Sequence, residues 1–282
     1  KRARRTSLRN GTASIETVEH CLAAVRALEI DNLTVELDNA ELPSCDGSSL
    51  PFVEALRKAG PVIQADAERQ VLQVTEPVRV FEGDAELVAW SGEPEKLEII
   101  YELDYGPKSP IGQQIHRFSL DVEGFVTQIA PSRTFVTEEE AQQLRAAGLG
   151  THLTYADVLV IGRDGPIENA YRYPNECVRH KILDLVGERS GNRRIFIQVA
   201  AACFGQRDAH HRAVAHPLAQ RRHEARVRLA QRRIGKVFPR VGDRERAAVE
   251  PREYPDHFGR GWRLVAEPAD PARGQEVEQQ LA

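Results

Sequence analysis

The stretch RHKILDLVG, residues 179–187, places a histidine and an aspartate four positions apart among apolar side chains. The apolar residues are typical of a buried helix. On a helix, residues i and i+4 lie one above the other on the same face, so His180 and Asp184 should point in the same direction. Three interpretations fit the pair alone: a His–Asp hydrogen bond on a partly wet face, two unrelated surface residues, or two ligands of one metal ion.

The composition is that of an ordinary soluble protein. The chain has 282 residues, 41% hydrophobic and 28% charged, which allows one large or two medium domains. The longest apolar run, residues 195–205, is too short for a membrane helix. The basic start, KRARRTSLRNGTASIE, lacks the apolar segment of a secretory signal. It also lacks a methionine, which favours a chain that begins part-way through a gene product.

The four cysteines are few for this length, which argues against a disulfide framework and favours a reducing compartment. We therefore expect a cytoplasmic protein. Cys177 and His180 have the C-x-x-H spacing of a zinc knuckle, but no second Cys/His pair with structural-site spacing accompanies them. A small buried thiol is the favoured interpretation of Cys177.

Charge divides the chain near residue 190. Residues 191–282 hold 17 Arg and one Lys against 11 acidic residues, whereas residues 1–190 hold 20 basic and 31 acidic residues. The Arg-rich tail shows no sustained periodicity, so we expect it to be irregular and disordered. Few aromatic residues and no recognition motif accompany the Arg residues, so no nucleic acid partner is expected. An out-of-frame translation of a GC-rich gene is a further hypothesis for this tail.

Two α+β units are predicted before that boundary. Residues 1–65 form a partial first unit, with a helix over 17–30, a strand within 31–39 and a helix over 51–59 ended by Gly60. Residues 68–190 form the second unit, in which alternating strands precede a helix capped by Thr137, another strand and the helix of residues 179–187. The fold class is therefore α+β.

Three collinear motifs carry a family resemblance. They are TVEHCLAA at residues 17–24, PSRTF at 131–135 and RYPNECVRHKILDLVG at 172–187. Together they resemble the UDP-3-O-acyl-N-acetylglucosamine deacetylases of lipid A biosynthesis, over roughly residues 10–188. The resemblance implies a zinc hydrolase built from two similar α+β sandwich domains packed face to face, the first of them incomplete here.

The resemblance also implies a set of site residues. His20, His180 and Asp184 would bind one Zn²⁺, and Glu19 would be the general base. Thr134 would help polarise the substrate's amide carbonyl, and Lys181 would lie beside the substrate. The sugar or acyl path would be lined by Phe135, and the hydrophobic acyl passage by Leu144, Leu149 and Leu153.

The chemistry of these residue types agrees with the resemblance. Two imidazoles and one carboxylate leave a zinc position open for water, as in catalytic sites. Glu19 adjoins the ligand His20, so its carboxylate can reach the same water. The implied reaction is deacetylation of a small UDP-linked acylated aminosugar, and the sequence does not indicate an oligomeric state.

Three departures favour an alternative, an inactive fragment or frameshifted product of such a gene. The family has further strands before its T-V-E-H motif, whereas about sixteen residues precede it here. Glu188 stands where the family has an aspartate. The family's downstream Ser-Gly-His element, whose histidine serves the leaving amine, has no match, although His210 and His211 lie near the expected distance.

Overall fold

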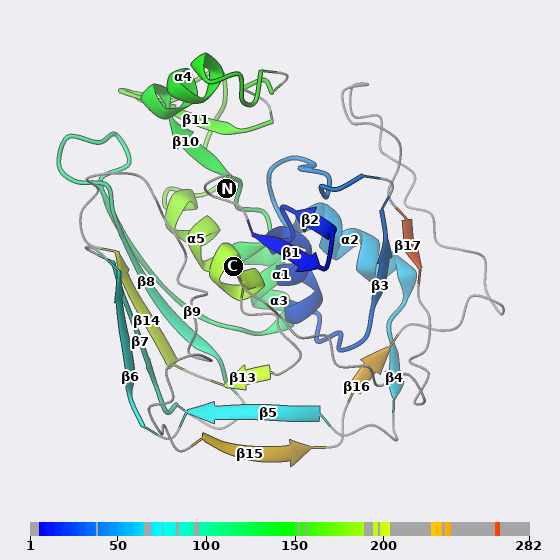
Figure 1. Ribbon diagram of the computed structural model, residues 1–282. Coiled ribbons are helices and arrows are strands. Elements are labelled where there is room, and N and C mark those ends of the chain that lie inside the picture. The colour runs from blue at the N-terminus through cyan, green and yellow to red at the C-terminus, as the bar shows by residue number, and fades with distance from the viewer. Residues whose placement is uncertain are drawn as a thin grey trace.

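Helix α5 (Glu176–Glu188) lies at the centre of the fold, with helix α1 (Glu19–Ala27) against one side and a β-sheet against another (Figure 1). The computed structural model describes residues 6–188 except 38, 65–68, 75, 83–84, 93–95, 152 and 156, together with 194–196, 198–203, 227–232, 235–237 and 263–265. Its mixture of helices and small sheets confirms the α+β class. None of the described helices has the length and apolar character that crossing a membrane requires.

The helix predicted at residues 17–30 is shorter at both ends. Thr17 and Glu29 have positive φ angles of 59° and 61°, outside the range of a right-handed helix. Helix α1 therefore lies between these two residues, and His20 belongs to its first turn. Helix α2 (Leu50–Ala59) agrees with prediction, because Gly60 ends it in the left-handed conformation with φ 72°.

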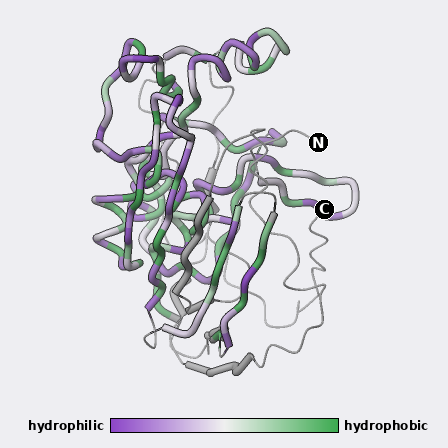
Figure 2. Tube along the Cα trace, turned by 90° about the vertical axis from the view of Figure 1, so that its left-hand side faces the viewer, coloured by the Kyte–Doolittle hydropathy of each residue, from purple (hydrophilic) through white to green (hydrophobic). Residues whose placement is uncertain are grey.

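The largest sheet has five strands in the order β6-β7-β14-β8-β9. Along β8, alternate residues are buried, and Ile99, Tyr101 and Leu103 belong to the same core as the apolar residues of α5. Figure 2 shows the matching alternation of hydrophobic and hydrophilic residues along the strands. The strands are β6 (Val78–Glu82), β7 (Ala85–Trp90), β8 (Glu98–Asp104), β9 (Gln113–Ser119) and β14 (Gln198–Cys203).

The irregular tail predicted after residue 190 is wrong for its described residues. β14 pairs parallel with β8 and antiparallel with β7, at the middle of the large sheet. The apolar run after residue 194 has the length and composition of a strand, and its Arg-rich surroundings concealed it. Four more strands come from this part of the chain: β13 (Arg194–Phe196), β15 (Val227–Arg232), β16 (Gly235–Val237) and β17 (Arg263–Val265).

A smaller sheet, in the order β10-β11-β12, projects at the top of Figure 1 together with helix α4 (Glu138–Ala146). The side chain of Thr137 accepts a hydrogen bond from the Glu140 backbone N–H, and the Glu140 side chain accepts one from the Thr137 N–H. This capping box confirms the predicted helix start. The strands are β10 (Phe135–Thr137), β11 (Leu159–Gly162) and β12 (Gly165–Pro166).

Short elements complete the described structure. The segment 122–129 forms α3 (Val122–Gly124), followed by the π-helical turn η1 (Phe125–Ile129). β1 and β2 form a hairpin that the sequence interpretation missed, although Gly11, which opens the two-residue loop with φ 57°, is a signal for a tight turn. The remaining strands are β1 (Ser7–Asn10), β2 (Ala13–Glu16), β3 (Thr34–Glu36), β4 (Val62–Gln64) and β5 (Arg69–Val74).

Candidate metal centre

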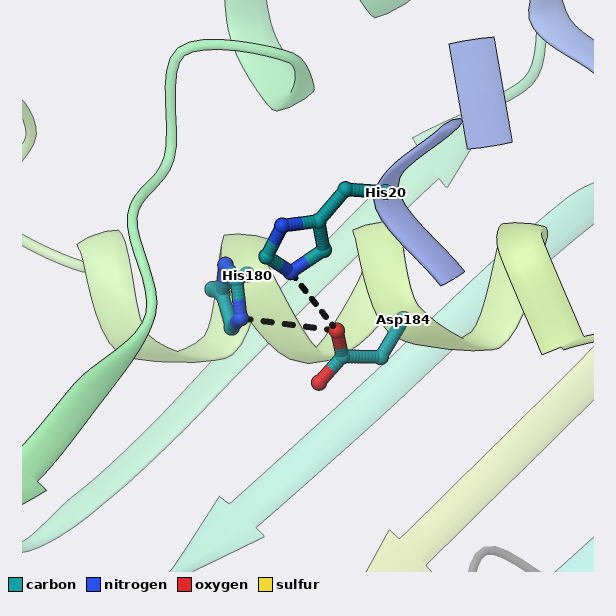
Figure 3. Close-up of side chains that lie close together, drawn as sticks. All are labelled: His20, His180 and Asp184. Carbon is teal, nitrogen blue, oxygen red and sulfur yellow. Dashed lines mark ion pairs between the residues drawn. The ribbon is translucent and has the colours of Figure 1, made fainter. Parts of the chain in front are cut away.

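His20, His180 and Asp184 converge where α1 meets α5 (Figure 3). Their ligand atoms all lie within 4.8 Å of one another. Asp184 Oδ1 is 3.7 Å from His20 Nε2 and 3.4 Å from His180 Nε2. The two imidazole rings are nearly perpendicular, with their centroids 5.1 Å apart. The structure thus brings His20 together with two residues that lie 160 and 164 positions later in the chain.

The local sequence of α5 explains why two of the candidate ligands face α1. His180 and Asp184 are one helical turn apart, while Ile182 and Leu183, between them, are fully buried. Burial of the apolar residues therefore fixes the rotation of the helix about its axis. With that rotation fixed, His180 and Asp184 both point towards α1.

A glycine sets the distance between the two helices. Gly187 lies within α5, and a Cβ atom added there would lie 2.0 Å from the backbone oxygen of Glu19. Only a residue without a side chain allows this approach. Glu19 directly precedes His20, so the close crossing at Gly187 also sets how near His20 lies to the ligands on α5.

The hydrogen bonding of His180 suits a metal ligand. Its Nδ1 lies 3.0 Å from the Ser132 carbonyl oxygen, to which it donates as the N–H tautomer. Nε2 then carries the free lone pair, and this is the nitrogen that faces Asp184. Ligating histidines typically use their second nitrogen in this way.

Both imidazoles are held in their neutral form. Burial and the adjacent His180 lower the pKa of His20 from 6.5 to about 4. Burial also lowers the pKa of His180. Metal binding requires deprotonated ligands, so the site is ready to bind a cation at neutral pH without first releasing protons from these rings.

Asp184 divides its two oxygens between different partners. Oδ1 faces the histidines, and Oδ2 accepts a hydrogen bond from Lys181 Nζ at 3.0 Å. Burial alone would raise the pKa of Asp184, but the neighbouring His180 and the charged Lys181 lower it to about 2. The carboxylate is therefore ionised, as a cation ligand must be. Conversely, burial opposes the charge on Lys181, yet Asp184 raises its pKa.

Glu19 lies beside the three candidate ligands and is almost completely buried. It is 8% exposed, and its Oε2 accepts a hydrogen bond from the Thr6 backbone N–H at 3.2 Å. Burial, with a further contribution from the Asp184 carboxylate, raises the pKa of Glu19 from 4.5 to about 7. A carboxyl group with this pKa exchanges protons readily at neutral pH, as a general base must.

The segment around Thr134 forms one wall of the site. The Phe135 ring packs edge-on against His180, with centroids 6.1 Å apart, and Lys181 Nζ lies 5.5 Å from the centroid of Phe135. Thr134 donates to the Gly47 carbonyl oxygen twice, from its N–H at 2.7 Å and from its hydroxyl at 3.2 Å. The hydroxyl of Thr134 is thus engaged with the turn at Gly47.

The three predicted acyl-passage leucines lie apart from the ligands, on the projecting unit that contains α4. Leu144 and Leu149 are 37% and 40% exposed, and Leu153 is partly buried. Helix α4 has no buried residue. Apolar side chains so exposed are available to an apolar ligand. His152, His210 and His211 lie outside the described residues.

Sequence reasoning missed several residues that support the site. Ser132 and Arg133 stand inside the quoted PSRTF motif, and Glu176 lies one turn before His180, but none was assigned a role. The i, i+4 spacing of Glu176 and His180 was the available signal. Gly187 stood within the predicted helix, but its close approach to α1 was not predicted.

Two imidazoles and one carboxylate, with no fourth protein ligand in this cluster of the described residues, form the donor set of a catalytic metal centre. The architecture is that of a metalloenzyme whose site lies between two helices. The chain belongs to the UDP-3-O-acyl N-acetylglycosamine deacetylase (LpxC) family, whose family model matches residues 1–216. The match reaches beyond the boundary predicted near residue 190.

Curated relatives agree with this assignment. The chain is 37% identical over 184 residues to a UDP-3-O-acyl-N-acetylglucosamine deacetylase of Leptospira biflexa serovar Patoc, covering 65% of this chain and 60% of the relative. It is 40% identical over 187 residues to the proteins of the same name from Brucella ovis and Brucella melitensis biotype 2, covering 65% of this chain and 63% of each relative. The chain thus spans less than two thirds of the length of these relatives.

Proposed function

We propose that this chain is a zinc-dependent deacetylase that hydrolyses the acetamide of UDP-3-O-acyl-N-acetylglucosamine in lipid A biosynthesis. The observation that carries the proposal is the convergence of His20, His180 and Asp184 beside the buried Glu19. The names of the relatives support the substrate. Two α+β halves, meeting at α1 and α5, would form the framework.

His20 Nε2, His180 Nε2 and Asp184 Oδ1 would hold the zinc ion. When bound, zinc supplies Lewis acidity and lowers the pKa of water to about 7. The tautomer of His180 and the ionised state of Asp184 fit this ion, because both ligand atoms already present lone pairs to one point. The fit therefore rests on the donor atoms and on their hydrogen bonds.

Glu19 would accept a proton from the water molecule that attacks the amide carbon. The proton then held by Glu19 is available to the leaving amine when the C–N bond breaks. Thr134 would assist the developing negative charge on the carbonyl oxygen once its hydroxyl turns away from Gly47. Lys181, held near Asp184 and Phe135, would lie beside the substrate.

The apolar side chains would contact the lipid part of the substrate. Phe135 forms the wall nearest the ligands, and the exposed Leu144 and Leu149, with Leu153, would contact the acyl chain further away. We infer a cytoplasmic location, which agrees with the free thiols of Cys21, Cys45 and Cys177.

The test combines metal content and turnover. The purified, dialysed protein should retain about one zinc per chain by elemental analysis, and His180→Ala should retain much less. The parent should release acetate from UDP-3-O-acyl-N-acetylglucosamine. Zinc without turnover would identify an inactive chain, and absence of zinc from both proteins would refute the assigned metal site.

A further inference from the structure

We propose that the buried ion pair between Arg133 and Glu176 is a positioning device for the metal site. It fixes the loop of residues 131–135 against α5, so that the Ser132 carbonyl orients the imidazole of His180. This inference rests on the proposed function of that site. Arg133 and Glu176 act through His180 and are therefore positioning residues.

Glu176 is the first residue of α5 and is completely buried, with 0% exposure. Its Oε1 accepts hydrogen bonds from the backbone N–H of Arg133 at 3.1 Å and from Arg133 Nε at 2.8 Å. Its Oε2 accepts hydrogen bonds from Arg133 Nη2 at 3.2 Å and from the backbone N–H of Arg172 at 2.7 Å. Both oxygens are thus saturated by donors. A carboxylate held in this way fixes two backbone segments relative to the helix start.

Arg133 extends the connection to a third segment. Its guanidinium donates to Asn169 Oδ1 at 2.9 Å and to the Ala170 carbonyl oxygen at 2.7 Å, in addition to Glu176. The side chain is 6% exposed. The planar fork of an arginine suits several acceptors at fixed angles, which a lysine cannot match.

Arg133 is next in sequence to the hydrogen-bond partner of a predicted zinc ligand, and Glu176 lies one helical turn before that ligand. Arg133 follows Ser132, whose carbonyl accepts from His180 Nδ1 at 3.0 Å. Glu176 precedes His180 by four residues and shares its face of α5. The loop and the helix are therefore joined by two adjacent contacts, the ion pair and the His180 hydrogen bond, and moving one changes the geometry of the other.

A structural role alone explains the pair poorly. Buried ion pairs contribute little net stability, because desolvation offsets much of the attraction between the charges. Partners of ligating histidines, in contrast, commonly affect metal affinity by 10- to 100-fold. The location of this pair next to the partner of a ligand favours positioning over stability.

The experiment uses two variants of the full chain. Arg133→Lys keeps the charge but loses the planar fork. The double variant Arg133→Met with Glu176→Gln removes both buried charges and keeps similar volumes, so it should fold. The control is Arg57→Met with Glu123→Gln, which removes the exposed ion pair between the last turn of α2 and α3.

Two measurements distinguish positioning from structure. Zinc affinity, from competition with a chromophoric chelator, should fall 10- to 100-fold in both test variants and stay unchanged in the control. In the metal-free proteins, the His180 Nδ1 proton should give a slowly exchanging NMR signal in the parent and control but not in the test variants.

Parent-like zinc affinity, or a retained Nδ1 proton signal, in either folded variant would overturn the proposal. If the double variant does not fold, Arg133→Lys decides. If the parent binds no zinc, the proposed function fails, while the NMR comparison in the metal-free proteins still supports or overturns the positioning role.

Discussion

Replacing Gly187 by alanine tests whether the helix crossing determines the metal site. The added Cβ would lie 2.0 Å from the Glu19 carbonyl oxygen and 2.8 Å from its carbonyl carbon, distances that real Cβ atoms do not reach. Contact becomes tolerable only beyond 3.0 Å, so α1 and α5 must separate by about 1 Å. The clash is between the Cβ of residue 187 and backbone atoms of Glu19, so a change of side-chain rotamer cannot relieve it.

The expected change in stability combines two opposing effects. Alanine has a better helix propensity than glycine by roughly 1 kcal/mol. Overpacking of a close contact costs about 1–3 kcal/mol. The second effect should prevail, so the free energy of unfolding should fall by up to about 2 kcal/mol in chemical denaturation of the metal-free protein.

The effect on zinc should exceed the effect on stability. Functional groups must be held within about 0.5 Å of their working geometry, and displacement by about 1 Å can reduce activity 100-fold. His20 would move away from His180 and Asp184, so zinc affinity should fall at least 10-fold. Ile182→Val is the matched control, since it loses about 0.5–1.5 kcal/mol from the core without altering the crossing.

Chelator competition measures the affinity of all three proteins. Parent-like zinc binding by Gly187→Ala, together with increased stability, would show that the helices accommodate a methyl group and would refute the reasoning. Gly187→Ser adds the same Cβ and should behave like Gly187→Ala.

Three further predictions concern individual side chains. Glu19→Gln should retain zinc in elemental analysis but lose about 10²–10⁴-fold in kcat; an unchanged kcat would exclude Glu19 as the base. In the metal-free protein, the pKa of His20 is about 4, whereas in the unfolded chain it is 6.5. The unfolded chain therefore binds a proton first, and the free energy of unfolding should fall by about 3 kcal/mol as pH falls from 6.5 towards 4. Glu19 has a raised pKa and acts in the opposite sense, so its contribution to the stability of the protein is lost as pH rises from 4.5 through 7. Denaturation curves of the parent are therefore compared with those of His20→Ala. The pH dependence of this variant should lack the histidine contribution. Leu144→Ser with Leu149→Ser should raise KM for long-chain substrates but leave thermal stability unchanged, because both side chains are exposed in the free protein. If the variant had the same KM as the parent for long-chain substrates, the two leucines would be excluded from the acyl passage.

The facing of His180 and Asp184 could be predicted from sequence because its signal is local: their spacing alone places them on one helical face. The family resemblance carried by three motifs added His20, and the structure brings the three side chains together. The same local rules predicted the helix start at Thr137 and the stop at Gly60. Each of these features depends on a few neighbouring residues, and the structure agrees with each.

Features that depend on distant partners escaped prediction. β14 lies between β7 and β8 because an apolar run pairs with two strands that precede it by a hundred positions or more. Neither charge nor periodicity around residue 200 indicates that pairing. Likewise, no spacing rule connects Arg133 with Glu176, or Gly187 with Glu19, since these contacts arise only when separate elements pack.

The polar face of α5 explains why a cation belongs at this site. Glu176, His180 and Asp184 follow one another at intervals of one turn, and each has a protein partner for one part of its side chain. The imidazole Nε2 of His180 and the Oδ1 of Asp184 face each other instead, together with His20. Because both histidines are neutral, neither ring offsets the negative charge on that oxygen. Converging lone pairs in a buried place are costly unless a cation binds them, so the same packing that buries α5 also creates the affinity for a metal.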